Sequence, residues 1–274
     1  MDFDTAPASS YPLSDLVKFL NDGFEDYFVP IQFDVDMFLN MIRKDGIDLT
    51  ASRVLIADEQ ASGIALIARR GWTSRLAAMG IAKENRGKGA GSWFMEQIIN
   101  EACQRGEREM SLEVIEQNEP PVKLYQKSGF QIVRRLISLI RKDAHEKEKS
   151  ILQEIDLREM GRLIFQYGLS DLPWQLSGES IGQMTPPARA YCRGQAYVAI
   201  SNPDAEHVVI WSLLVEQNAR GNGHGTDLLK SVIANHKGKT WHVPALFPEE
   251  FESVFIKAGF EREELSQWQM RLAL

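Results

Sequence analysis

A six-residue glycine-rich stretch occurs twice in this chain of 274 residues, each time with the spacing Arg-x-x-Gly-x-Gly. The first copy is residues 86–91 and the second is 220–225, so the two arginines are 134 residues apart (220 − 86 = 134). Each copy follows an apolar run typical of a strand and begins an amphipathic helix. Such a turn lets backbone N–H groups meet an anion at the positive end of the helix dipole. The repeat therefore predicts two phosphate-binding turns in two similarly built halves.

Length and composition agree with two domains. A chain of 274 residues is long enough for two domains of ordinary size, and with 44% apolar residues each half can bury a core. Residues 141–149 are highly charged and nearly free of large apolar side chains, which is typical of a solvated linker. We therefore expect an N-terminal domain over 1–143 and a C-terminal domain over 144–274.

Charge and cysteine content exclude several classes of protein. The net charge is −7 and the pI is near 5.4, which argues against a nucleic-acid partner. Two cysteines, one in each half, cannot form a disulfide framework, and the five histidines are too scattered for a metal site. The N-terminus lacks the pattern of a secretory signal, and no apolar run is long enough to span a bilayer. We expect a cytoplasmic protein with no metal and no membrane partner.

The first half reads as helix, helix, three strands, helix, strand, helix, strand. The expected helices are 13–24, 37–46, the one that follows the first glycine-rich turn and ends at Gly106, and 121–128. The expected strands are 54–57, 63–68, 75–81, 110–115 and 130–140. Short strands joined by tight turns predict an antiparallel meander. The fold class is α/β (α+β), a mostly antiparallel mixed sheet flanked by helices.

The second half repeats this plan in altered form. We expect helices at 157–167, from the second turn to about 238, and a short one ending at 258. We expect strands at 196–201, 208–215, 241–246 and from 260 onward. Residues 173–187 carry a tryptophan and two prolines, and we expect an irregular loop there.

A second motif also occurs in both halves. An aromatic-x-Lys-x-Gly-Phe segment lies at 125–130 and again at 255–260. The first half moreover carries a long stretch over 79–91 and an asparagine, Asn118, seven residues before Tyr125. In these motifs the chain resembles the GNAT superfamily of acetyl-CoA-dependent N-acetyltransferases, in a tandem arrangement. The resemblance covers about 10–142 and, more weakly, 150–274, and it implies two tandem GNAT-like domains.

The resemblance implies acetyl-CoA as co-substrate and a primary amine, on a small molecule or a peptide, as acceptor. Backbone amides of the first turn and the hydroxyl after it would bind the pyrophosphate, the preceding strand would pair with the pantetheine arm, and an asparagine would contact the cofactor from the neighbouring strand end. The residues in these roles are Arg86, Gly87, Lys88, Gly89, Ala90, Gly91 and Ser92, then Met79 and Ile81, and Asn118.

Two residues are candidates for proton transfer. The resemblance places Tyr125 near the sulfur, where a phenol could protonate the leaving thiolate. Glu113 is the best-placed carboxylate for a general base, because its strand should lie beside the strand of Met79 and Ile81. Each has an ordinary structural explanation as well, Tyr125 as a core aromatic and Glu113 as an exposed strand carboxylate. The sequence leaves these alternatives open.

The second half departs from the family pattern at the positions expected to carry the chemistry. Phe255 stands at the Tyr125 position, and Pro248 lies seven residues before it, at the Asn118 position. Phenylalanine cannot donate a proton, so we expect a degenerate second domain and a catalytic first one. Two other functions remain open: an acyl-CoA sensor without turnover, and a dinucleotide-binding enzyme, which the antiparallel meander disfavours. The acceptor and the oligomeric state are not predicted.

Overall fold

A computed structural model describes residues 2–142 and 151–274. The predicted linker, 141–149, therefore lies almost wholly outside the described residues. The chain forms two compact units. Unit 1 is Met1–Val133 together with Gln269–Leu274, and unit 2 is Arg134–Trp268.

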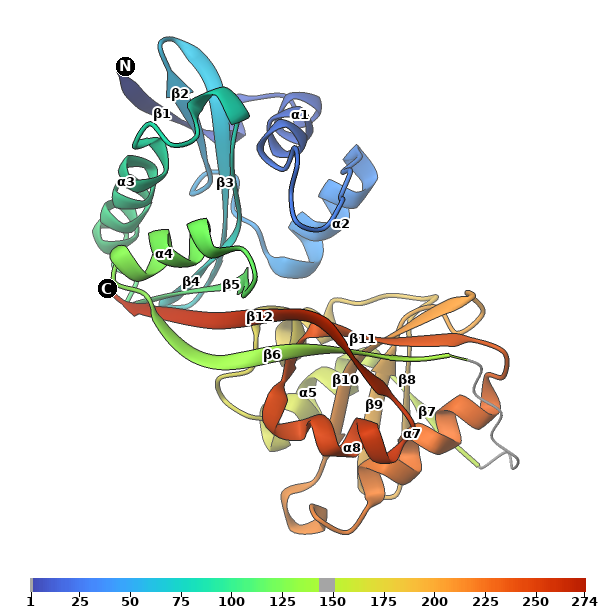
Figure 1. Cartoon of the computed structure of the whole chain (residues 1–274). Coiled ribbons are helices and arrows are strands. Elements are labelled where there is room, and N and C mark those ends of the chain that lie inside the picture. The colour runs from blue at the N-terminus through green and yellow to red at the C-terminus, as the bar shows by residue number, and fades with distance from the viewer. Residues whose placement is uncertain (1, 143–150) are drawn as a thin grey trace. The chain divides into compact units, whose positions relative to one another are not determined.

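Unit 1 has the order of elements predicted for the first half as far as the last helix, with one additional strand at its start (Figure 1). The last predicted strand, at 130–140, lies mostly in unit 2. Its strands are β1 (Phe3–Pro7), β2 (Arg53–Ala57), β3 (Gln60–Arg70), β4 (Thr73–Ile81) and β5 (Glu109–Ile115). Its helices are α1 (Leu13–Gly23), α2 (Val35–Asp45), α3 (Ala90–Gln104) and α4 (Glu119–Lys127), with 3-10 turns η1 (Ala8–Ser10) and η2 (Lys83–Asn85). Asp34 caps α2 by accepting the Met37 N–H at 2.7 Å, and Gly46 ends that helix in the left-handed region.

The sheet of unit 1 is mixed, as predicted. Strands β1 to β4 pair antiparallel in sequence order, and β4 then pairs with β5 in parallel. Figure 1 shows α1 and α2 on one face of these strands and α3 and α4 on the other. β3 is buried along most of its length, and Ile64 through Ala68 form the centre of the core. A strand covered by helices on both faces has this continuous apolar pattern.

Unit 2 repeats the plan with more strands than predicted. Its strands are β6 (Gln131–Arg141), β7 (Gln153–Ile155), β8 (Arg189–Arg193), β9 (Ala196–Ile200), β10 (His207–Val215), β11 (Thr240–Pro248) and β12 (Glu261–Ala273). Its helices are α5 (Leu157–Tyr167), α6 (Gly178–Gly182), α7 (His224–Asn235) and α8 (Glu252–Lys257), with 3-10 turns η3 (Trp174–Leu176), η4 (Gln217–Ala219) and η5 (Glu249–Phe251). The expected loop at 173–187 thus contains η3 and α6, and β7 and β8 were not predicted.

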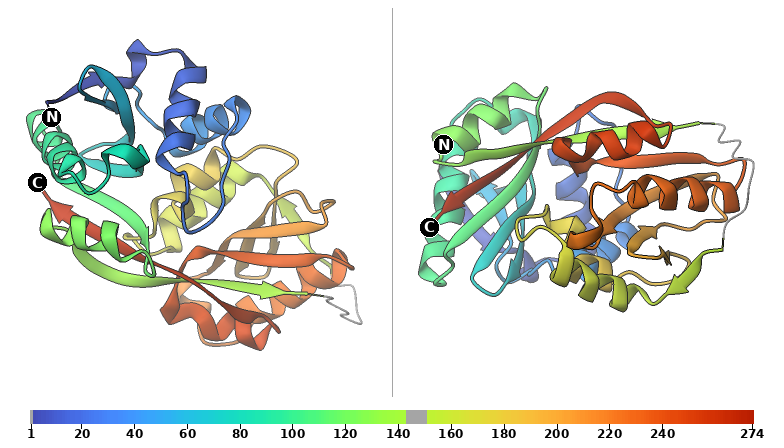
Figure 2. Two further views of the ribbon diagram at one scale, coloured as in Figure 1. Left: turned by 45° about the horizontal axis from the view of Figure 1, so that its top comes forward. Right: turned by 90° about the horizontal axis from the view of Figure 1, so that it is seen from below.

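Two apolar cores lie on opposite faces of the sheet in unit 2. Val198 and Ile200 of β9 pack in the core that includes Leu228 and Val232 of α7, whereas Ala199 between them packs with Met160 and other residues of α5. Successive side chains of a strand point to opposite faces, so one strand serves both cores. The two views of Figure 2 show helices on both sides of these strands.

The compact units differ from the predicted boundary after residue 143. β6, the last strand of the first repeat, pairs antiparallel with β11, from Leu136↔Pro248 to Arg141↔Trp241. The end of β12, the last strand of the second repeat, belongs to unit 1, where the Leu274 N–H donates to the Arg108 carbonyl at 3.0 Å. Each repeat therefore completes its sheet with the last strand of the other. A charged stretch in the sequence marks the end of β6 and gives no sign of this exchange.

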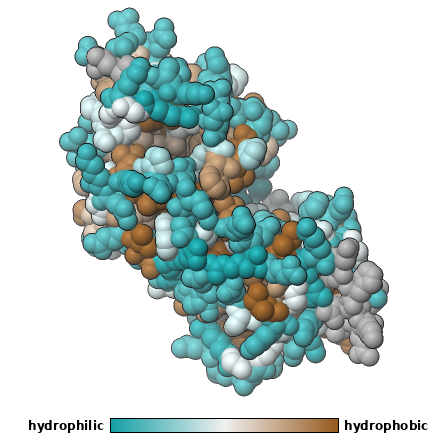
Figure 3. Space-filling model, viewed as in Figure 1, coloured by the Kyte–Doolittle hydropathy of each residue, from teal (hydrophilic) through white to brown (hydrophobic). Residues whose placement is uncertain are grey.

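Charged and polar side chains cover most of the face shown in Figure 3, with separate apolar patches between them. Within 2–142 and 151–274, no helix is long and apolar enough to cross a membrane.

Candidate active site

The two glycine-rich turns have nearly identical backbone conformations. The φ angles of Gly87 and Gly89 are +73° and +87°, and those of Gly221 and Gly223 are +82° and +84°. A Cβ atom at any of the four would meet nothing within 4 Å. Glycine is therefore required for the left-handed conformation of each turn and not for lack of space.

Each turn leads into a helix whose first N–H groups have no side-chain cap. Gly89 is the N-cap of α3 and Gly223 is the N-cap of α7, and neither helix start receives a side-chain hydrogen bond. Uncapped donors at the positive end of a helix of 15 or 12 residues form a site for an anion. The predicted backbone ligands at 86–91 thus have the geometry to hold a pyrophosphate. Ser92 is exposed in the first turn of α3.

The arginine of each motif is a structural clamp. Arg86 donates from Nε to the Ile81 carbonyl at 2.7 Å and from Nη2 to the carbonyls of Gly23 and Glu25 at 3.0 and 3.1 Å. Arg220 likewise donates to the Val215 carbonyl at 3.1 Å and to the Tyr167 carbonyl. In both units the guanidinium joins the turn to the end of the preceding strand and to the C-terminus of the first helix. The sequence did not predict this role.

Both sites contain a pair of splayed parallel strands. β4 pairs with β5 over Thr73–Arg75, and β10 pairs with β11 over His207–Val209, positions that differ by 134. Beyond these three residues, none of the described pairing continues between the two strands of either pair. Met79 and Ile81 therefore lie on a stretch of β4 that has a partner on one side only, β3. Their free strand edge can pair with an extended ligand, as predicted for the pantetheine arm.

A β-bulge occurs at the same point in both units. The register of β4 with β3 passes from Ile67↔Leu76 to Leu66↔Ala78, which makes Ala77 the extra residue. The register of β10 with β9 passes from Ile210↔Ile200 to Ser212↔Ala199, which makes Trp211 the extra residue. A bulge turns the following backbone and side chains away from the regular pattern and is common beside active sites. It was not predicted, because one extra residue leaves no mark in an apolar run.

Tyr125 is on α4 and is only 8% exposed. Its ring makes an edge contact with Phe130, with centroids 5.9 Å apart. Burial, with a smaller effect from the nearby Tyr27 phenol, raises the pKa of Tyr125 above its ordinary value of 10.0. The phenol therefore keeps its proton at neutral pH. Tyr27 lies between α1 and α2 and contacts Phe24 at 4.7 Å between centroids.

Glu113 is not the exposed strand carboxylate that was the alternative expectation. Its Oε2 accepts a hydrogen bond from Nε of Arg75 at 2.7 Å, and the two side chains are 3% and 6% exposed. Asp45 lies on the far side of the guanidinium, 3.8 Å from Nη1, and burial raises the pKa of its carboxyl. The other oxygen of Glu113, Oε1, is buried and has no hydrogen-bond partner among the described residues. Because Arg75 is the last residue of β4 that pairs with β5, this ion pair lies where these two strands separate.

Asn118 is at the N-terminus of α4, directly after β5. Its N–H donates to the Ile115 carbonyl at 3.1 Å, and its side chain makes no capping bond. The side chain of Asn118 therefore lies at the strand end without a capping role. Lys88 is exposed in the turn. Among residues 2–142 and 151–274, no group of three histidine, cysteine, aspartate or glutamate side chains is placed to hold a metal ion.

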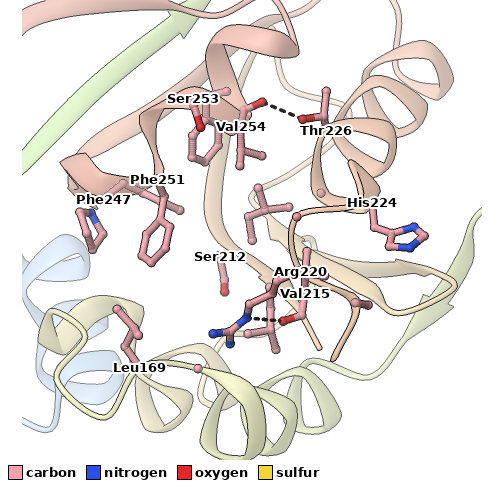
Figure 4. Close-up of a pocket in the computed structure, with 18 of the residues that line it drawn as sticks. Leu169, Ser212, Val215, Arg220, His224, Thr226, Phe247, Phe251, Ser253 and Val254 are labelled. Atoms are coloured by element: carbon pink, nitrogen blue, oxygen red, sulfur yellow. Dashed lines mark hydrogen bonds between the residues drawn. The ribbon is translucent and has the colours of Figure 1, made fainter. Parts of the chain in front are cut away.

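The second unit has a cavity of about 460 Å³ at the corresponding place, between β10 and β11 (Figure 4). Its wall includes the second turn, the end of β11 and Phe255. Phe255 is the counterpart of Tyr125 in the repeated motif. Its place in the cavity wall indicates where this motif position lies in each site. Phe255 is 1% exposed and makes edge contacts with Phe247 and Phe260.

One family of known proteins matches part of the sequence. Residues 50–132 match the acetyltransferase (GNAT) domain family. No curated protein matches the chain. The matched residues lie in the N-terminal half, the half with the complete set of motifs.

Solved structures with the same fold cover the whole chain. One is a GCN5-related N-acetyltransferase from Sphaerobacter thermophilus, with 14% identity and a TM-score of 0.69 over 99% of this chain and 95% of that one. Another is a putative acetyltransferase from Pyrococcus horikoshii, with 13% identity and a TM-score of 0.67 over 100% and 89%. A third is a tandem GNAT protein from the clavulanic acid biosynthesis pathway, with 12% identity and a TM-score of 0.64 over 99% and 98%. The chain thus has the tandem GNAT fold that the motifs predicted.

Proposed function

We propose that the protein is an N-acetyltransferase that transfers the acetyl group of acetyl-CoA to a primary amine, and that the chemistry occurs in the N-terminal domain. One observation carries the proposal. The first domain has the splayed strands, the uncapped α3 N-terminus and a buried phenol, whereas the second has the first two features and a hydrocarbon in place of the phenol.

The residues of the first domain would divide the work as follows. The backbone N–H groups of the turn and the start of α3 would hold the pyrophosphate, and the free edge of β4 at Met79 and Ile81 would align the pantetheine arm and the acetyl carbonyl. Tyr125 would donate its proton to the departing sulfur. A neutral phenol suits this step, because negative charge develops on the sulfur only as the bond breaks.

Glu113 remains our proposed proton acceptor, through the Oε1 atom that the Arg75 pair leaves uncommitted. A buried carboxylate oxygen without a hydrogen bond is costly, and a catalytic role is one explanation for such a group. Glu113→Gln keeps the shape and should lower kcat with little change in the KM for acetyl-CoA or in Tm, and Glu113→Asp should restore part of the loss. An equal loss of Tm and activity would instead assign Glu113 a role in stability alone.

The proposed activity is tested by measuring free thiol released from acetyl-CoA in the presence of a panel of small amines and peptide N-termini. We expect thiol release that depends on the amine and equals the acetylated amine formed. Direct attack also requires that labelled acetyl-CoA alone leaves no label on the protein. Tight binding of acetyl-CoA with no amine-dependent thiol release across the panel would favour the alternative of a sensor without turnover.

A further inference from the structure

The first domain carries an uncovered apolar segment. It comprises residues 24–39, which are the connection between α1 and α2 and the start of α2 (Figure 1). Among the described residues, thirteen large apolar side chains are exposed, and six of them belong to this segment: Phe28, Val29, Ile31, Val35, Met37 and Leu39. Exposing so many apolar side chains in one place is unfavourable, so the segment has the character of a binding surface.

The segment has a fixed conformation. The side chain of Asn21 donates from Nδ2 to the Phe33 carbonyl at 3.0 Å and accepts the Phe33 N–H at 2.8 Å, which closes the connection into a loop. Within the loop, the Phe24 ring makes edge contacts with the rings of Tyr27 and Phe33, with centroids 4.7 and 6.1 Å apart. Asp34 then caps α2. The exposed apolar side chains are therefore presented by a built loop and not by a loose one.

The loop begins where the thioester is proposed to lie. Gly23, at the end of α1, meets Gly80 backbone to backbone, and Gly80 lies between the two β4 residues proposed to align the acetyl carbonyl. Arg86 holds the same end by donating to the carbonyls of Gly23 and Glu25. The first residues of the loop are therefore fixed beside the free edge of β4.

The loop also reaches the proposed proton donor. The Tyr27 phenol is near enough to Tyr125 to raise the pKa of that phenol further, and burial raises the pKa of Tyr27 itself. Phe28 and Ile31, which follow directly, are 55% and 41% exposed. A molecule that lies on these two side chains would therefore have one end close to Tyr125.

The charge of this part of the chain is entirely negative. Residues 19–42 contain five aspartate or glutamate residues and no lysine or arginine. Asp26 forms an ion pair with Lys83 at 2.8 Å, whereas Glu25 and Asp36 are exposed on the segment. Such a surface attracts a protonated amine and repels a molecule that bears a carboxylate or a phosphate.

We propose that the acceptor is a primary amine on an apolar body that bears no anionic group, and that Phe28 and Ile31 select it. The proposal rests on the proposed acetyl transfer and names the class of its acceptor. The apolar body would lie on the segment, with the amine toward Tyr125. The neutral nitrogen forms a bond to the acetyl carbon, the carbon–sulfur bond breaks, the nitrogen loses one proton and the sulfur gains one. The products are the N-acetylated amine and free CoA.

The test is the rate of thiol release by the full-length protein from saturating acetyl-CoA with matched amines. 2-Phenylethylamine differs from ethylamine by its ring and from free phenylalanine by the carboxylate, and spermidine supplies positive charge without an apolar body. We expect kcat/KM for 2-phenylethylamine to exceed each of the other three values at least about tenfold, because it alone buries an apolar body without an anion. A smaller advantage over any of the three would overturn the acceptor class and leave acetyl transfer standing. No thiol release with any amine would overturn acetyl transfer, and the acceptor class with it.

Single substitutions locate the contact. Phe28→Ser and Ile31→Ser should each raise the KM for 2-phenylethylamine about fivefold, because apolar contact is lost, with the KM for acetyl-CoA and Tm unchanged. Ile132→Ser is the matched control, since Ile132 is 42% exposed against 41% for Ile31 and lies outside the segment. Equal effects of Ile31→Ser and Ile132→Ser, or unchanged kinetics in both segment variants, would contradict the proposal. So would a change from dimer to monomer in Phe28→Ser with unchanged kinetics, which would make the segment an interface between copies of the chain.

Discussion

The two domains share a backbone plan and differ in what fills it. In the first, α1 meets β4 backbone to backbone, and a Cβ atom on Gly23 would lie 2.7 Å from Gly80. In the second, Leu214 stands at the Gly80 position and packs in the core with Ile164 of α5. A side chain thus separates helix from strand where the first domain has none, and both Leu214 and Ile164 line the cavity. The turn, the splayed strands and the bulge are common to both domains. The side chains that fill the space between helix and strand differ, and they determine what each domain can bind.

The two domains also differ in charge at the point where the paired parallel strands separate, which we call the throat. Arg75 and Glu113 form a buried ion pair in the first domain. By strand register, Val209 and Pro244 take these positions in the second, since Arg75 pairs with Ser111 and Val209 with His242. A polar throat occurs in the domain that carries the phenol, and an apolar throat occurs in the domain that carries the cavity.

The largest effect is expected from breaking this ion pair. Arg75→Met leaves the Glu113 carboxylate buried and unpaired, which should lower the free energy of unfolding by about 3–5 kcal/mol. The double variant Arg75→Met, Glu113→Leu should recover much of this loss, as urea unfolding can measure. If the double variant instead lost as much free energy of unfolding as the two single variants added together, the two side chains would not be coupled. That result would contradict the ion pair.

The next effect is on turnover. Tyr125→Phe makes the first site resemble the second and should lower kcat by roughly 10²-fold, because a positioned proton donor is lost. Binding of acetyl-CoA should change little. The matched variant Phe255→Tyr should neither restore the loss nor add activity. A wild-type rate in Tyr125→Phe would remove Tyr125 from the mechanism and favour the sensor.

The clamp should have a smaller effect, confined to one domain. Arg86→Ala removes three hydrogen bonds that fix the turn to β4 and α1. We expect the KM for acetyl-CoA to rise about tenfold, equivalent to about 1.4 kcal/mol, within the range for charge-assisted hydrogen bonds. Arg220→Ala, which removes the equivalent clamp, should leave the steady-state kinetics unchanged. Equal effects of the two variants would contradict the assignment of chemistry to the first domain.

The smallest effect concerns pH and the burial of Tyr125. Its pKa is raised above 10.0 in the folded protein, so below that pH the phenol is protonated in both states and its contribution to stability is fully present. Above pH 10, the Tyr125 phenol loses its proton in the unfolded chain before it does so in the folded protein. The free energy of unfolding therefore falls with rising pH until the folded pKa is reached, by up to about 1.4 kcal/mol per pH unit. Tyr125→Phe should show a shallower alkaline decline, which chemical denaturation at several pH values can check.

The sequence predicted the fold and the frame of the site because both depend on local patterns. Glycines of positive φ before an amphipathic helix identify the turn, and apolar runs identify the strands that precede it. The exchange of β6 and β12 was not predictable, since pairing between distant strands leaves no local pattern. The cavity of the second unit was missed for a similar reason, because residues far apart in the sequence line it.

The most direct test of the central claim compares two glycine variants in the same assay. Gly89→Val and Gly223→Val impose the same strain on equivalent turns, at φ angles of +87° and +84°. Thiol release is measured with saturating acetyl-CoA and one amine substrate, after circular dichroism has shown that both variants are folded. We predict that Gly89→Val abolishes acetyl transfer and that Gly223→Val keeps most of it. Activity that survives in Gly89→Val and is lost in Gly223→Val would place the active site in the second domain and contradict the account.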